Sequence, residues 1–128
     1  MRIVLLSDCH FSKGKSSSES SFPERYTDIA DILFLRLIHR INKYLKPDIS
    51  VICGDLTDSP EDAESLEVIA QYLKLLQTPV IVVPGNHDLP AEAFYQHIPR
   101  PPEYIDIKGF RFIPFIDPER PSYKEDRT

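Results

Sequence analysis

One short apolar run that ends in two carboxylates constrains the fold of this chain most strongly. Residues 49–52 are mostly apolar and β-branched, and Cys53-Gly54-Asp55-Leu56-Thr57-Asp58 follows them directly. The next residues, Ser59-Pro60-Glu61-Asp62, are typical of a helix start. Asp55 and Asp58 therefore lie where a buried strand ends and a helix begins. In open α/β sheets this edge, at the carboxyl ends of the strands, is where ligands bind.

The same pattern of an apolar run followed by a polar cluster occurs twice more. Residues 3–6 precede Asp8-Cys9-His10, and residues 80–83 precede Pro84-Gly85-Asn86-His87-Asp88. Apolar runs without alternation predict strands that are buried on both faces, as in a parallel sheet.

Two amphipathic stretches separate the three predicted strands. The first helix is expected to start at the capping box Ser21-Phe22-Pro23-Glu24 and to stop before Pro47, and the second to cover about residues 60–76. Such crossovers are long enough to join parallel strands, so the fold class is α/β with the order β-α-β-α-β. Right-handed crossovers place both helices on one face, and the other face is then left uncovered.

The remainder of the chain predicts smaller elements. Residues 91–98 are expected to form a short helix, and residues 104–107 and 110–116 a C-terminal hairpin. We therefore expect one domain over residues 1–116, followed by a polar tail at 117–128 that frays.

Composition limits the function classes. The 128 residues carry a formal net charge of −5, which argues against a basic nucleic-acid-binding surface and leaves nucleic acid only as a substrate. Two cysteines do not make a disulfide framework. No apolar run is long enough to span a membrane, and the N-terminus lacks the features of a signal peptide. The expected location is therefore cytoplasmic.

The three polar clusters should meet at one edge of the sheet. Carboxylate, imidazole and amide oxygen groups are ligands for divalent metal ions, and no cysteine points at the cluster, which argues against structural zinc. The alternative interpretation is a set of ordinary turns and helix caps at the rim of a sheet. The residues concerned are Asp8, His10, Asp55, Asp58, Asn86, His87 and Asp88.

In combination, Asp8-x-His10, Gly54-Asp55-x-x-Asp58 and Gly85-Asn86-His87-Asp88 resemble the calcineurin-like metallophosphoesterase family. The resemblance implies a phosphohydrolase that cleaves phosphodiesters or phosphomonoesters with hydroxide activated by two divalent ions, which would be Mn, Fe, Zn or Mg. It also implies a role for each residue: Asp8 and His10 on one metal, Asp55 bridging both, Asn86 on the second metal, His87 beside the substrate, Asp88 orienting His87, and Asp58 supporting the turn or a ligand.

The sequence departs from the family pattern in its second half. The family completes its site with a further histidine and a Gly-His-x-His motif, whereas the remaining histidines here, His39 and His97, lie in other contexts. The chain thus resembles the first half of a metallophosphoesterase α/β sandwich, and we expect a C-terminal half or a second chain to complete the site. The alternative is a non-catalytic metal- or phosphate-binding module, or an inert fragment.

Residues 12–21 are rich in serine and predict a surface loop close to the site. One interpretation is a solvated linker. The other is a lid on which Lys13 or Lys15 approaches an anionic substrate.

Overall fold

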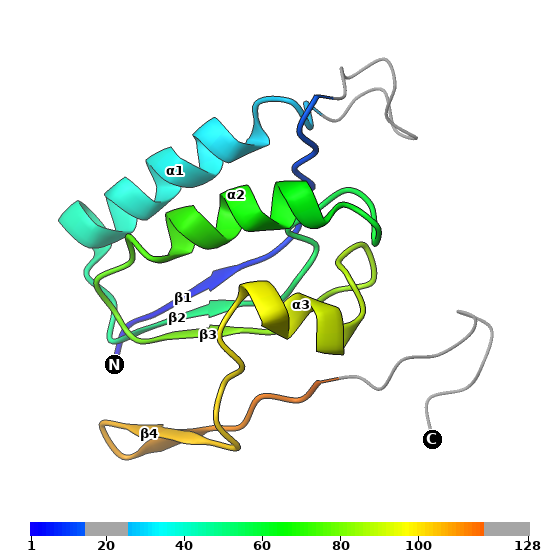
Figure 1. Cartoon of the computed structure of the whole chain (residues 1–128). Helices are drawn as coiled ribbons and strands as arrows, with labels where there is room; N and C mark the ends of the chain where they lie inside the picture. The colour runs from blue at the N-terminus through cyan, green and yellow to red at the C-terminus, as the bar shows by residue number, and fades with distance from the viewer. Residues whose placement is uncertain (15–25, 117–128) are drawn as a thin grey trace.

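A computed structural model of the chain describes residues 1–14 and 26–116, and its centre is a three-stranded parallel sheet (Figure 1). The strands are β1 (Ile3–Leu6), β2 (Ile49–Ile52) and β3 (Val80–Val82), in the spatial order β1-β2-β3. Leu6 pairs with Ile52, which pairs with Val82, so the three strands end level with one another. The predicted β-α-β-α-β order is confirmed, and the three polar clusters leave the sheet at one edge.

Both crossover helices cover the same face of the sheet, as expected (Figure 1). The first is α1 (Ala30–Arg40), which continues into the π-helical turn η2 (Ile41–Leu45). The second is α2 (Ala63–Leu73), and the short helix α3 (Ala91–His97) packs against it.

Both crossover helices begin later than predicted. Residues 26–29 form turns, so α1 starts at Ala30; the capping box at residues 21–24 lies outside the described residues. In α2 the carboxylate of Asp62 accepts a hydrogen bond from the Ser65 backbone N–H at 3.0 Å. Asp62 is therefore the N-cap, which leaves the proline at position 60 outside the helix.

The core lies between the sheet and the helices. Phe34 and Ile38 of α1, and Leu66 and Ile69 of α2, pack with Ile52 at the centre of the sheet, and all five are buried. Burying side chains of this size stabilises a fold by roughly 1.5–3 kcal/mol each, which holds the sheet and its polar edge in place.

The opposite face of the sheet is open along β1. Ile3 is 42% exposed and Leu5 is 70% exposed, so the prediction that the first strand is buried on both faces was wrong. The expectation of an uncovered apolar face is confirmed there. The antiparallel hairpin of β4 (Ile105–Ile107) and β5 (Phe110–Phe112) lies on the side of the sheet away from α1 and α2 (Figure 1).

Candidate metal centre

The three polar clusters are joined to one another by backbone groups. The Asp8 N–H donates to the Gly54 carbonyl at 3.1 Å, and the His10 N–H donates to the Asp55 carbonyl at 2.9 Å. The third cluster joins when the His87 N–H donates to the Asp55 carboxylate at 3.0 Å. The Asp55 segment therefore lies between the other two and contacts both.

Two glycines permit this close approach. Gly54 has a φ of +84°, and a Cβ placed on it would lie 2.1 Å from the Gly85 backbone nitrogen. A Cβ on Gly85 would lie 2.2 Å from a carboxylate oxygen of Asp55. Neither distance is tolerated by real atoms, so the glycine before each polar residue is a steric requirement of the site.

The backbone is strained at three of the predicted metal ligands. Asp8, His10 and Asp55 have φ values of +60°, +49° and +53°, in the left-handed region that residues with a side chain rarely adopt. Such conformations cost of order 1–3 kcal/mol each and cluster at active sites and ligand clamps. Left-handed backbone at three neighbouring polar positions is typical of sites that bind a ligand.

His10 connects the ligands through its two ring nitrogens. Its Nε2 lies 3.5 Å from Oδ1 of Asp8 and 3.9 Å from Oδ2 of Asp55, and its Nδ1 lies 3.6 Å from Oδ1 of Asp58. The ring is buried, whereas the Asp8 side chain is 65% exposed. One face of the centre is thus open to solvent, and the imidazole forms its inner wall.

The donor set fits a divalent cation. One ligand atom each from Asp8, His10 and Asp55 lies within 4.8 Å of the others, and two carboxylates with one imidazole suit borderline to hard ions. The carboxylate of Asp58 behind Nδ1 resembles the outer partner that orients a metal-ligating imidazole and raises its basicity. The arrangement therefore directs Nε2 of His10 toward the two carboxylates.

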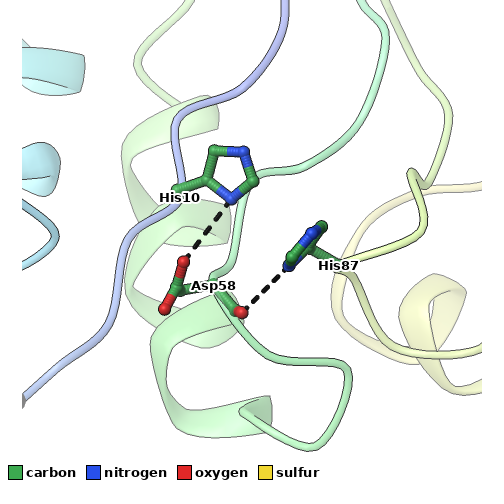
Figure 2. A group of neighbouring side chains, drawn as sticks. All are labelled: His10, Asp58 and His87. Carbon is green, nitrogen blue, oxygen red and sulfur yellow. Dashed lines mark hydrogen bonds and ion pairs between the residues drawn. The ribbon is translucent and has the colours of Figure 1, made fainter. Parts of the chain in front are cut away.

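Asp58 contacts both histidines of the cluster, as Figure 2 shows. Its carboxylate faces Nδ1 of His10, and its backbone carbonyl lies 3.1 Å from Nδ1 of His87. Because a carbonyl oxygen only accepts, the Nδ1 of His87 must carry the proton of this hydrogen bond. His10, Asp58 and His87 also lie close enough together to hold an ion themselves, as a second three-ligand group that shares His10 with the first.

Asp88 is placed differently from the role that the resemblance implies. Its buried carboxylate accepts hydrogen bonds from the backbone N–H groups of Thr57 and Gly85, both at 2.9 Å. Burial raises the pKa of Asp88, and these N–H donors oppose the shift. The described contacts thus place the Asp58 carbonyl, and not the Asp88 carboxylate, against the ring of His87.

Four further residues were considered for the site, and the structure does not bring them into this cluster as it describes it. Asn86 is exposed on the same turn as His87. Lys13 forms an ion pair with Glu64 at the start of α2, and Lys15 lies outside the described residues. His97 was expected in a loop, but it is the last residue of α3, where it pairs with Glu67 at 2.9 Å.

Thr57 was not among the residues predicted for the site. This threonine is completely buried, and both its N–H and its hydroxyl face the cluster of turns. One signal in the sequence could have found it. Thr57 is a polar residue between Asp55 and Asp58, at a position where the Gly-Asp-x-x-Asp motif accepts any residue.

The two cysteines differ sharply in their surroundings. Cys9 packs against the core, and burial raises the pKa of its thiol to about 12, whereas Cys53 is exposed. Because the thiolate is the nucleophile, iodoacetamide at pH 8 should alkylate Cys53 at least ~100-fold faster than Cys9. Mass spectrometry of tryptic peptides measures both rates. Denaturant should remove the difference, and equal rates in the folded protein would contradict the burial of Cys9.

Fold and site together define the class of the protein: an α/β domain with a carboxylate–imidazole centre at the carboxyl edge of a parallel sheet. The chain belongs to the calcineurin-like phosphoesterase family, whose model matches residues 1–123. This match confirms the resemblance and the fold class inferred from the three motifs. Among the described residues, no helix has the length and apolar character needed to cross a membrane.

The chain is also similar to a curated protein. The chain is 36% identical over 89 residues to a probable glycerophosphodiester phosphodiesterase GpdQ of Arcobacter nitrofigilis. The aligned stretch is 69% of this chain and 30% of the relative. The chain therefore spans less than a third of that protein.

Proposed function

We propose that this chain carries the N-terminal part of a dinuclear, metal-dependent phosphohydrolase. The observation that carries the proposal is the meeting of Asp8, His10 and Asp55 within 4.8 Å, each on strained backbone. Membership of the phosphoesterase family supports a phosphate-ester substrate. The printed name of the relative favours phosphodiesters over phosphomonoesters.

In this proposal Asp8 and His10 hold one ion, Asp55 holds both, and Asn86 contributes to the second. When bound, two divalent ions supply hydroxide at neutral pH and neutralise the phosphate oxygens. Mn, Fe, Zn and Mg all accept such ligands to some degree. Asp58 keeps His10 oriented through Nδ1, so that the lone pair of Nε2 faces the two carboxylates.

His87 is proposed to act on the substrate. Its Nδ1–H is committed to the Asp58 carbonyl, so Nε2 is the nitrogen that faces the substrate. With a second proton on Nε2 the ring would donate to a phosphate oxygen or protonate the leaving group, and without it Nε2 only accepts. His87 is only partly buried, so a substrate could reach its ring. Asp88 supports this histidine by holding the turn on which it lies.

The site also needs ligands from elsewhere. Within residues 1–14 and 26–116, His39 is exposed on α1 and His97 pairs with Glu67, so neither adds a nitrogen to the cluster. We propose that further polypeptide, either in the same chain or in a second one, supplies them. A second candidate function is a non-catalytic module that binds one metal ion or phosphate. The observation in its support is the small number of nitrogen ligands that the described residues bring to the cluster.

Calorimetry with Mn²⁺ separates the two candidates. Two binding events per chain, with Mn²⁺-stimulated hydrolysis of bis(p-nitrophenyl) phosphate, are expected for a dinuclear phosphohydrolase. One weak event without turnover would favour the binding module. Because ligands from outside this chain would affect both readouts, the same measurement should be repeated with the proposed further polypeptide present, either fused to the chain or added as a second one. Absence of two sites there would refute the dinuclear proposal.

A further inference from the structure

His87 is held by the neighbouring turn through three of its own groups. Its N–H donates to the carboxylate of Asp55 at 3.0 Å, and its Nδ1–H donates to the carbonyl of Asp58 at 3.1 Å. Its carbonyl accepts from the hydroxyl of Thr57 at 3.1 Å. Asp55 and Asp58 were among the residues predicted for the site, whereas Thr57 was not.

The hydroxyl of Thr57 lies in a setting that only a hydrogen-bond donor satisfies. Its oxygen lies 3.1 Å from the His87 carbonyl, 3.2 Å from Oδ1 of Asp88 and 3.4 Å from the Ser59 carbonyl. All three neighbours are hydrogen-bond acceptors, so the hydroxyl proton of Thr57 is the donor that they share. Thr57 is fully buried, and water cannot readily replace a lost donor there.

The carboxylate of Asp88 adds a second link between Thr57 and the turn that carries His87. Its Oδ1 accepts from the backbone N–H of Thr57, and its Oδ2 accepts from the backbone N–H of Gly85. The carboxylate therefore joins the turn after β2 to the turn after β3. Thr57 also forms an isolated β-bridge with Phe11, which connects the turn after β1.

We infer that Thr57 is a positioning residue for His87, acting through its hydroxyl and through the carboxylate of Asp88. It fixes the peptide of His87 so that the ring keeps its Nδ1–H on Asp58 and presents Nε2. The metal-facing contacts of His10 do not pass through this hydroxyl, so its loss should affect His87 selectively. The value of this positioning for catalysis rests on the proposed function, but the geometry can be tested without turnover.

The test compares substitutions that separate the hydroxyl from the methyl group. Thr57→Val removes the hydroxyl and keeps the volume, Thr57→Ala removes both groups, and Thr57→Ser keeps the hydroxyl alone. Because the serine and alanine variants differ only in the hydroxyl, their comparison remains decisive if the valine variant fails to fold. Thr78→Val is the matched control, since the hydroxyl of Thr78 also makes a hydrogen bond, to Ser50, at the other end of the sheet.

The readouts are the ring tautomer of each histidine by ¹⁵N NMR at pH 8 and the exchange rate of the His87 amide hydrogen. We expect the valine and alanine variants to lose the Nδ1–H preference of His87 and to exchange its amide about fivefold faster or more. The serine variant and Thr78→Val should match the wild type, and the ring of His10 should be unchanged in all of them.

Three results would overturn the inference. These are a serine variant as perturbed as the alanine variant, a His87 that no substitution changes, and a His10 ring that changes as much as the His87 ring. The first would assign the effect to packing, and the last to general loosening of the turns. Because the NMR readouts require neither metal nor turnover, failure of the hydrolysis test would leave this result standing.

Discussion

Replacing Asp55 by asparagine should abolish Mn²⁺-stimulated hydrolysis, with a loss of at least ~100-fold in kcat, and should remove one of the two expected Mn²⁺ binding events. The carboxylate lies 3.9 Å from Nε2 of His10 and accepts from the His87 N–H, so it stands between two of the three clusters. Loss of an outer partner of a metal ligand already costs about 10–100-fold in affinity or activity, and loss of a bridging ligand should cost more. Calorimetry and a phosphodiester assay, both with the proposed further polypeptide present, measure the two effects.

The control for this prediction is Asp106→Asn. Asp106 is a half-exposed residue of the hairpin, where it pairs with Arg111, and its substitution should leave Mn²⁺ binding unchanged. The thermal midpoint of both variants should be compared, because asparagine at position 55 keeps an oxygen that can accept from His87. Equal activity in Asp55→Asn and wild type would rule out a bridging role for Asp55.

Gly54→Ala should destabilise the fold by about 3 kcal/mol or more and should eliminate Mn²⁺ binding. A left-handed conformation costs a residue with a side chain roughly 1–2 kcal/mol. The new Cβ would also lie 2.1 Å from the backbone nitrogen of Gly85, which cannot swing aside as a flexible side chain would. Such overpacking typically costs about 1–3 kcal/mol in addition. Denaturant unfolding of the purified variants measures the total.

Gly109→Ala separates the two costs. Gly109 has a φ of +83°, almost the same as that of Gly54, but no atom lies within 4 Å of the position that its Cβ would occupy. This variant should lose only the conformational contribution of roughly 1–2 kcal/mol and should keep its Mn²⁺ affinity. If both alanine variants lose the same stability, the contact between the turns after β2 and β3 does not constrain the site.

Much of this architecture follows from local patterns. The apolar runs at residues 3–6, 49–52 and 80–83 predict parallel strands because they lack the alternation of a half-exposed sheet. The three strands, both crossover helices and the short helix at 91–98 all occur in the structure. Helix starts were predicted less well, since Asp62 competes with earlier residues for the N-cap and only the folded chain decides between them.

The exposure of β1 shows where a local pattern is insufficient. Ile3 and Leu5 are as apolar as the residues of β2, and nothing in their sequence marks them as exposed. Their burial depends on what lies beside and beneath the first strand, which is a property of the assembled domain. A central strand such as β2 is flanked on both sides, and its Ile49 and Ile52 are fully buried.

For the site, the sequence alone determined which residues meet. Asp8, His10, Asp55, Asp58 and His87 follow three successive strands, and parallel strands bring such residues to one edge. Only the tertiary structure decided how they face one another: His10 between two carboxylates and Asp58, and His87 against the Asp58 carbonyl. The physical reason is that these contacts depend on left-handed backbone and on glycines packed against a neighbouring turn, which no single segment specifies.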